Sequence, residues 1–303
     1  MAELNFKTEM EFAYGEPREL VPGVVRIVAN NPSPFTFKGT NTYLVGTDEL
    51  ALIDPGPRDE AHLAAVLRAA AGRPITHIVL THTHHDHFDG LADLARAVPD
   101  AKICGYGRAA RSGTGTRLAA DGTETSDVDF VPGIALRDGD VITGKGWRLE
   151  ALHTPGHAPD HLCFELGGTG VLFSADHVMA WSTSVVAPPE GRMADYMTSL
   201  ERLMGRSADK IYLPGHGGQL AEPQRVARAY LLHRRWREEA ILGAIRDGHH
   251  AVADIVGVIY RGLDERLVRA ATLSVLAHVE HLIERKRAVC DGPPNSESLI
   301  YAA

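Results

Sequence analysis

The chain has 303 residues, of which 44% are hydrophobic, and it carries a formal net charge of −8. This length allows one large domain, or a domain of about 200 residues with a smaller one, and the hydrophobic fraction excludes an intrinsically disordered chain. The negative charge does not favour a polyanionic partner for the protein as a whole, although it leaves room for a local basic patch.

The three cysteines, Cys104, Cys163 and Cys290, are odd in number and far apart in the sequence. This pattern predicts free thiols in a reducing compartment and not a disulfide framework. The N-terminal residues lack the apolar core of a secretory signal, and no apolar run reaches the length of a membrane span. We therefore expect a soluble, cytoplasmic protein with no membrane partner.

Short strand-like runs dominate the first two-thirds of the chain, and helical patterns interrupt them. One predicted helix covers residues 58–71, with Leu63, Val66 and Leu67 on one face, and another covers residues 193–206. The predicted strands lie at residues 24–28, 41–45, 50–54, 75–80, 102–106, 147–152, 162–166 and 170–175. Strands mixed with helices in this order predict an α/β layered domain.

The C-terminal part of the chain differs in character from the rest. Three helical patterns follow one another there, at residues 223–247, 252–261 and 264–287. We therefore expect an α/β domain over residues 1–222 and a small helical module over residues 223–303. Within the first domain, residues 108–130 are poor in large apolar side chains, so they form either a mobile loop or a lid.

One short turn concentrates side chains that bind metals. The stretch LTHTHHDHFDG follows a predicted strand and carries five of them: His82, His84, His85, Asp86 and His87. Packing does not require such a cluster. Two neutral imidazoles separated by one residue can bind one divalent ion, and an Asp–His pair beyond them can bind a second. This set of donors suits Zn²⁺, and also Mn or Fe.

Further ligands must come from other parts of the chain, because one turn cannot fill two coordination spheres. His157 lies in a Pro-Gly turn, Asp176 at the end of a predicted strand, and His216 in a turn flanked by glycine. Each follows a short hydrophobic strand, so all of them can meet at the ends of strands. The candidate ligands are His82, His84, Asp86, His87, His157, Asp176 and His216.

The remaining assigned histidines fall outside this pattern. His85 and His153 lie within the same motifs, and either a structural role or a hydrogen bond to a ligand fits them. Structural or solvated roles are expected for the others, which are His62, His77, His233, His249, His250, His278 and His281.

The ordered ligand set resembles the metallo-β-lactamase superfamily over roughly residues 20–222. This resemblance implies a four-layer αβ/βα sandwich with a dinuclear metal site at the edge between its two sheets. The ligands implied for the first metal are His82, His84 and His157. Those implied for the second are Asp86, His87 and His216, and Asp176 would bridge both metals. An aspartate bridge, in place of a cysteine, resembles the hydrolase branches more than the true lactamases.

A dinuclear site of this kind supplies hydrolytic chemistry. Two Zn²⁺ ions about 3.5–4 Å apart can share a water molecule and lower its pKa to about 7, and the bridging hydroxide is then the nucleophile. We expect Asp176 to hold the metals at their separation and Asp86 to orient the hydroxide, so these two are the predicted catalytic residues. No G-x-S-x-G motif competes for the role of nucleophile.

Five further residues are predicted near the substrate: Thr40, Asn41, Phe88, His177 and Trp181. The resemblance places Thr40 and Asn41 in a hairpin near the site, where they either touch the substrate or only form a turn. His177 and Trp181 follow Asp176 and line either the pocket or an apolar wall, and Phe88 stands where relatives commonly have a small residue. Asp54 resembles an acidic residue that supports the metal-binding turn through hydrogen bonds.

The C-terminal module narrows the resemblance. A long helix containing HRRWREEAI (233–241) and a module ending in LAHVEHLIERKRAV (276–289) are similar to the β-lactamase-like protein 2 group, over nearly the whole chain. That group includes mitochondrial single-strand endoribonucleases, bacterial relatives and fungal thioesterases acting on carrier-bound polyketides. The resemblance implies a winged-helix-like tail.

Two activities follow from this resemblance. The first is hydrolysis of an ester or thioester of a small or carrier-bound acyl substrate, which the acidic net charge favours. The second is a single-strand endoribonuclease that cleaves phosphodiesters with the same site. The basic run between Arg225 and Arg237 favours RNA as a partner, although a basic helix face is more often simply solvated. A role of the tail in a homodimer is compatible with either activity.

Overall fold

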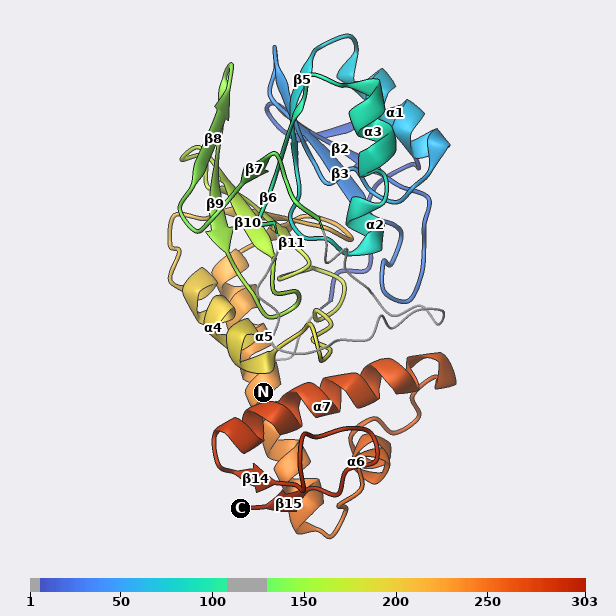
Figure 1. Ribbon diagram of the computed structural model, residues 1–303, viewed down its shortest axis with the longest axis vertical. Helices are drawn as coiled ribbons and strands as arrows, with labels where there is room; N and C mark the ends of the chain where they lie inside the picture. Colours follow the sequence, from blue (N-terminus) through green and yellow to red (C-terminus); the bar gives the residue numbers. More distant parts are fainter. Residues whose placement is uncertain (1–5, 108–129) are drawn as a thin grey trace.

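A computed structural model describes residues 6–107 and 130–303. The predicted loop or lid over residues 108–130 therefore lies outside the described residues, apart from Phe130. Two β-sheets and their covering helices form the larger part of the described chain, and the C-terminal helices form a lobe at one end of it (Figure 1).

The first sheet has seven strands within the described residues, in the order β1-β2-β3-β4-β5-β6-β7. Neighbouring strands from β1 to β4 are antiparallel, and those from β4 to β7 are parallel. The strands are β1 Arg18–Val21, β2 Val24–Val28, β3 Asn41–Val45, β4 Leu50–Ile53, β5 Ile75–Val79, β6 Lys102–Gly105 and β7 Ile134–Ala135.

The second sheet has six strands within the described residues, in the order β13-β12-β11-β10-β9-β8. Its neighbouring strands are antiparallel, except for the parallel pair β11 and β12. The strands are β8 Val141–Gly144, β9 Trp147–His153, β10 Leu162–Leu166, β11 Val171–Ala175, β12 Ile211–Pro214 and β13 Leu220–Ala221.

Helices pack on the outer faces of both sheets and form the C-terminal lobe. The helices are α1 Glu60–Ala70, α2 His85–Phe88, α3 Leu91–Ala97, α4 Met193–Met204, α5 Pro223–Arg246, α6 Val252–Ile259 and α7 Val268–Glu284, with a 3₁₀ turn η1 at Glu265–Leu267. Two short strands, β14 Ala288–Val289 and β15 Tyr301–Ala302, pair with each other in this lobe, and β14 contacts α7. No helix in the described part of the chain combines the length and apolar character needed to cross a membrane.

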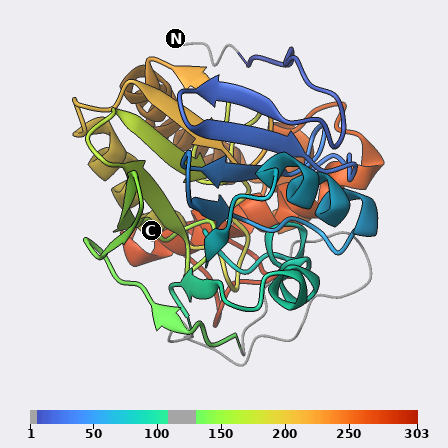
Figure 2. The same cartoon turned by 90° about the horizontal axis from the view of Figure 1, so that it is seen from above.

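The buried side chains fall into layers that define a sandwich. Tyr43 of β3 and Phe173 of β11 meet between the sheets, with ring centroids 5.2 Å apart. Val66 of α1 packs on the outer face of the first sheet, and Tyr196 of α4 packs on that of the second. Figure 2 shows the two sheets side by side with helices outside them. This is the predicted four-layer αβ/βα arrangement.

The burial of individual strands follows from their place in these layers. All but one residue of β5 are buried, as expected for a parallel strand covered on both faces. In β9, Trp147 and Leu149 point into the core while Arg148 is exposed, which is the alternation of a strand with one covered face. Parallel strands end at the same edge of a sheet, and that edge carries the candidate site.

The helix α5 belongs to both lobes. Its residues Ala227, Tyr230 and Leu231 are buried in the cluster beneath the second sheet, whereas Ile241 and Ile245 are buried among α6 and α7. Figure 1 shows α5 running from the sandwich into the C-terminal lobe. The predicted boundary at residue 223 therefore lies at the start of a helix that both lobes share.

The predicted elements agree closely with the structure. The eight predicted strands and five predicted helices are present with ends shifted by a few residues, and the first residues of the last predicted helix form η1. The four-residue helix α2 and the short strands β1, β7, β8, β13, β14 and β15 were not predicted, because such short elements have no clear periodic pattern. The three cysteines are free thiols, as predicted.

A buried carboxylate joins α5 to α7 in the C-terminal lobe. Oε1 of Glu238 accepts a hydrogen bond of 2.5 Å from Nδ1 of His281, and Nδ1 of His278 lies 3.5 Å from the same oxygen. We expect Glu238→Ala to lower the free energy of unfolding by about 1–3 kcal/mol, because the buried Nδ1 of His281 loses its hydrogen-bond acceptor. Urea denaturation of the full chain measures this, and an unchanged midpoint would contradict it.

The same group makes a pH-dependent contribution to stability. Burial works to raise the pKa of Glu238, but the neighbouring His278 and the hydrogen bond from His281 lower it to about 2. The folded pKa is below the unfolded value of about 4.3, so this stabilisation is present above pH 4.3 or so and is lost as the pH falls toward 2. The stability difference between the wild type and Glu238→Gln should therefore be constant near neutral pH and shrink in acid.

Candidate metal centre

The ends of four strands carry the seven predicted ligands to one place. The chain leaves β5 at Val79 and places four ligands in the turn and in α2, while Asp176 follows β11 directly. The loops after β9 and β12 add His157 and His216. Three overlapping groups of potential ligand atoms result: His82, His84 and His157; His82, His87 and Asp176; and Asp86, His87 and His216.

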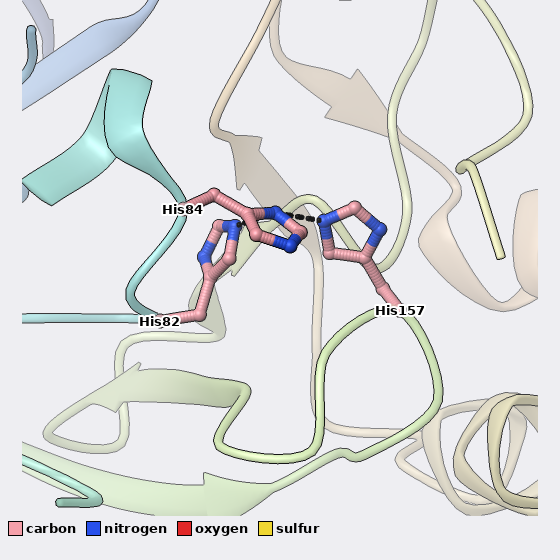
Figure 3. A group of neighbouring side chains, drawn as sticks. All are labelled: His82, His84 and His157. Atoms are coloured by element: carbon pink, nitrogen blue, oxygen red, sulfur yellow. Dashed lines mark hydrogen bonds between the residues drawn. The ribbon is translucent and has the colours of Figure 1, made fainter. Parts of the chain in front are cut away.

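Three imidazoles form the first group (Figure 3). Nδ1 of His84 lies 3.0 Å from Nε2 of His82 and 3.0 Å from Nε2 of His157. Two nitrogens bound to one tetrahedral zinc ion, each at about 2.0–2.1 Å, would be about 3.3 Å apart. All three side chains are buried, so this close set of nitrogens fits one metal ion with little adjustment.

Two imidazoles and a carboxylate form the second group. Nε2 of His87 and Nε2 of His216 lie 3.3 Å apart. Oδ2 of Asp86 lies 3.3 Å from the first of these nitrogens and 3.2 Å from the second. A nearly equilateral set of two nitrogens and one oxygen is a donor set that divalent metals accept.

The carboxylate of Asp176 faces both groups. Its Oδ1 lies 3.4 Å from Nε2 of His87, and its Oδ2 lies 3.2 Å from Nε2 of His216 and 3.7 Å from Nε2 of His157. Oδ1 is buried and accepts no hydrogen bond from the described residues. An orphaned carboxylate oxygen at this depth destabilises the fold unless a cation binds it, so the site fits a pair of metal ions.

Backbone carbonyl groups orient two of the imidazoles. Nδ1 of His157 donates a hydrogen bond of 2.7 Å to the carbonyl oxygen of Val185, and Nδ1 of His216 donates one of 3.3 Å to that of Gly39. Because Nδ1 carries the donated proton, Nε2 is the atom presented to the site. Such partners fix the tautomer and the direction of a metal-binding histidine.

Asp54 orients ligands of both groups. Its Oδ2 accepts hydrogen bonds of 2.8 Å from Nδ1 of His87 and 2.7 Å from Oγ1 of Thr81, and its Oδ1 accepts one of 2.8 Å from the amide of Thr81. The Thr81 hydroxyl can then accept from Nδ1 of His82, 2.9 Å away. The predicted support of the metal-binding turn by Asp54 is confirmed.

The charges of the site divide its histidines into two kinds. Burial, with His87 and His84 beside it, lowers the pKa of His82 well below its usual value. Burial also works to lower the pKa of His216, but Asp176 and Asp86 raise it to about 10. Imidazolium protons thus balance the carboxylates of the second group, and metal binding there would release protons.

A glycine leaves room for Asp176. A Cβ atom on Gly215 would lie 2.2 Å from Oδ1 of Asp176 and 2.6 Å from Cε1 of His87. We expect Gly215→Ala to displace both ligands and to lower the metal content measured by elemental analysis, with a loss of affinity of about 10- to 100-fold or more. Gly243→Ala is the control, because a Cβ there meets nothing within 4 Å. Full metal content in the Gly215 variant would contradict this reading of the site.

The hairpin residues predicted near the substrate are both fully buried. Oγ1 of Thr40 donates a hydrogen bond of 2.9 Å to Oδ2 of Asp86, so it orients a ligand. The side-chain amide of Asn41 donates to the carbonyl oxygens of Pro214 and Gly217, 2.8 and 2.9 Å away. The amide of Asn41 thus joins β3 to the turn that carries His216, and its contact with a substrate stays a prediction.

The other three predicted pocket residues lie in different surroundings. Trp181 lines a cleft beside the metal centre and stacks on Phe37, with ring centroids 4.9 Å apart. Phe88 is partly buried against Phe130, away from this cleft. His177 is fully buried beneath the site, and burial lowers its pKa to about 3, so it does not line the surface of the pocket.

One histidine of the site was missed. His161 is fully buried, its Nε2 accepts a hydrogen bond of 3.3 Å from the amide of Asp176, and its Nδ1 lies 2.9 Å from Oγ1 of Thr154. It therefore fixes the backbone at Asp176. His161 is the last residue of the motif HTPGHAPDH. Its position four residues after His157 gave no sign of whether its side chain is buried at the site or exposed at the surface.

Two acidic residues near His84 were also missed. Oε2 of Glu190 lies 3.7 Å from Nε2 of His84. Asp160 accepts a hydrogen bond of 2.8 Å from Oγ1 of Thr83, and burial raises the pKa of its carboxyl. His85 and His153 bond instead to Asp89 and to the carbonyl oxygen of Pro159, so neither supports a ligand directly.

Comparison with known proteins agrees with this geometry. The family model described as the metallo-beta-lactamase superfamily matches residues 35–216, which contain every predicted ligand. The chain belongs to the metallo-β-lactamase superfamily. A second model, the beta-lactamase associated winged helix domain, matches residues 251–293, so the C-terminal lobe of this superfamily member contains a winged helix domain.

Curated relatives and solved structures resemble nearly the whole chain. A beta-lactamase-like protein 2 homolog from Drosophila melanogaster is 31% identical over 93% of this chain and 95% of its own length. An atrochrysone carboxyl ACP thioesterase from Claviceps purpurea (strain 20.1) is 31% identical over 82% of this chain and 75% of its own. A metallo-beta-lactamase family protein from Thermus thermophilus is 26% identical, with a TM-score of 0.74 over 94% of this chain and all of its own.

Proposed function

We propose that this superfamily member is a dinuclear metallohydrolase that cleaves an ester or thioester of a small or carrier-bound acyl substrate. The observation that carries the proposal is the position of Asp176, whose two carboxylate oxygens lie between two separate groups of ligand atoms. A single structural metal would need only one such group, and it would be closed by four ligands.

The ligands suit two zinc ions, and manganese or iron would accept the same donors. His82, His84 and His157 would hold one ion, and Asp86, His87 and His216 the other. When bound, a pair of divalent ions activates a water molecule and polarises the carbonyl oxygen under attack. This chemistry needs no nucleophile from the chain itself.

The residues of the chain position this reaction. Asp176 would fix the separation of the two groups, and His161 holds the backbone that carries Asp176. Asp86 is held by Thr40 through a hydrogen bond of 2.9 Å, so its carboxylate keeps one direction as it orients the attacking water. Asp86 and Asp176 are accordingly the proposed catalytic residues.

Two observations support an acyl substrate. The thioesterase from Claviceps purpurea shares 31% identity with this chain over 257 residues. The cleft beside the metal centre is lined by Trp181, Val185 and Leu263 among other residues, and such apolar walls can accommodate an acyl chain. We infer that the scissile carbonyl lies at the metal centre and that the acyl group or its carrier arm extends along the cleft.

The endoribonuclease alternative has weaker support. Of the basic residues that favoured it, Arg225 pairs with Glu222, Arg235 pairs with Glu201, and Arg234 is 4% exposed. These residues do not form one free basic face on α5. A cytoplasmic location and a homodimer remain parts of the proposal, the first because the three cysteines are free thiols.

One assay separates the two activities. Protein purified without chelators is analysed for metal, reconstituted with zinc or manganese, and tested against a panel of acyl thioesters and against labelled single-stranded RNA. We expect about two metals per chain and turnover of thioesters that is lost after treatment with a chelator. A folded protein that binds no metal after reconstitution, or one that cleaves only RNA, would sink the proposal.

A further inference from the structure

A cleft of about 300 Å³ opens beside the metal centre. His157 and Asp176 lie at its inner end, and Tyr260, Leu267 and Ser274 of the C-terminal lobe lie on its far side. Sites for small molecules typically enclose about 300–1,000 Å³. The cleft is thus large enough for part of a substrate, and both lobes form its walls.

Two arginines of α5 line this cleft. Arg234 and Arg237 are three positions apart, so they lie on the same face of the helix. Arg234 is 4% exposed, it donates a hydrogen bond to the carbonyl oxygen of Ser184, and its buried Nε has no partner among the described residues. Cζ of Arg237 lies 4.3 Å from the centroid of the Tyr260 ring.

These arginines differ from an exposed neighbour in having no counter-ion among the residues that the structure describes. Arg235 forms an ion pair of 2.8 Å with Glu201, whereas no carboxylate of the described residues pairs with Arg234 or Arg237. Two like charges in a partly buried place repel each other and lose hydration. Burial accordingly lowers the pKa of Arg237, and Arg234 lowers it further. An anion bound in the cleft would remove this repulsion.

We propose that Arg237, supported by Arg234, binds an anionic oxygen group of the substrate while the scissile carbonyl lies at the metal centre. This proposal rests on the proposed hydrolase function and deepens it. A guanidinium stacked on an aromatic ring keeps its N–H groups in one plane, where they can donate two parallel hydrogen bonds to a carboxylate or a phosphate. The enzyme therefore selects acyl thioesters that carry a negative charge remote from the bond that is cleaved.

Two sources can supply this charge: a carboxylate on the acyl chain, or the phosphate of a phosphopantetheine arm. Three probes separate them, namely hexanoyl-N-acetylcysteamine, adipoyl-N-acetylcysteamine and hexanoyl-phosphopantetheine. The full-length, metal-loaded protein is compared with Arg237→Gln, with the conservative Arg237→Lys, and with Arg228→Gln. Arg228 is the matched control, because it is an exposed arginine on the same helix that does not line the cleft.

We expect Arg237→Gln to lower kcat/KM for one anionic probe by about 10- to 100-fold, the effect of losing a charged hydrogen-bonded pair. The neutral probe should change by less than about 2-fold, and lysine should restore part of the loss because it keeps the charge. The anionic probe that responds identifies the source of the charge. The Arg228 variant should match the wild type with all three probes.

Equal losses for the neutral and anionic probes would mean that Arg237 only supports the fold, and the proposal would be wrong. An unchanged preference among the probes, or a loss confined to labelled single-stranded RNA, would also overturn it. Calorimetry with a thioether analogue of the adipoyl probe, and with a matching analogue of the hexanoyl-phosphopantetheine probe, measures binding without hydrolysis. If the wild type hydrolyses no thioester, the proposed function fails, whereas binding of either analogue that Arg237→Gln weakens still supports the anion site.

Discussion

Replacing Asp176 with alanine is expected to abolish hydrolysis while leaving the fold intact. Asp176 lies directly after β11 at the edge of the sheet, so its removal takes no apolar side chain from the core. It does remove a carboxylate that faces His87, His157 and His216 together. Removing a residue that only hydrogen-bonds to a metal ligand typically lowers activity by about 10- to 100-fold. Because Asp176 is a proposed ligand itself, the loss of turnover should exceed about 100-fold.

The Asp176 variant is measured by elemental analysis, by turnover of an acyl thioester and by circular dichroism. Asp89→Ala is the matched control, because the Asp89 side chain is 43% exposed at the end of α2 and, among the described residues, bonds to His85 and to no proposed ligand. The control should keep its metals and its activity. An Asp176 variant that retained both metals and near-full turnover would show that Asp176 does not bridge them.

The convergence of the candidate metal ligands could be predicted from the sequence because much of their arrangement is local. His82, His84, Asp86 and His87 lie within one turn after a strand, and a strand that ends at a sheet edge delivers its next residues to that edge. His157, Asp176 and His216 likewise each follow a strand, so each could be assigned to the same edge separately. Their convergence then required only that the strand ends meet, which a two-sheet α/β fold ensures.

The supporting residues could not be predicted, because their roles depend on contacts between distant segments. The role of His161 depends on its hydrogen bond from the amide of Asp176. The role of Asn41 depends on its hydrogen bonds to carbonyl oxygens of Pro214 and of the turn after β12. A polar residue in a hairpin gives no sign of whether it faces a substrate or a neighbouring backbone. The hydrogen bonds of Asn41 fit the alternative in which it only forms a turn, and its contact with a substrate stays a prediction.

The arginines of α5 illustrate a different limit. Helical periodicity places Arg234 and Arg237 on one face, but it does not reveal what that face meets. The structure turns this face toward a cleft whose far wall comes from Tyr260 and Leu267. The run of basic residues that suggested RNA therefore has members in different surroundings. Arg225 and Arg235 are exposed and form ion pairs, whereas Arg234 is buried and Arg237 lines the cleft.

Removal of residues 223–303 is expected to prevent folding of the sandwich itself. Tyr230 and Leu231 of α5 are buried beneath the second sheet with Tyr196 and Leu200 of α4. Burial of two such side chains stabilises a fold by about 3–6 kcal/mol, which is a large part of a typical total of about 5–15 kcal/mol. A chain that ends at residue 222 should therefore be recovered mainly as aggregate, in contrast to the full-length protein.

A chain that ends at residue 247 keeps α5 and separates stability from substrate selection. It retains Tyr230, whose hydroxyl donates a hydrogen bond of 2.6 Å to the carbonyl oxygen of Met179 in the segment between Asp176 and Trp181. It loses Tyr260 and Leu267, which form the far wall of the cleft. If this chain is recovered folded, we expect it to bind metal and to hydrolyse a small activated ester, but to lose discrimination among larger acyl substrates. A folded, metal-loaded chain ending at residue 222 with unchanged selectivity would show that the C-terminal lobe contributes neither to the core nor to the site, and would leave dimerisation as its better explanation.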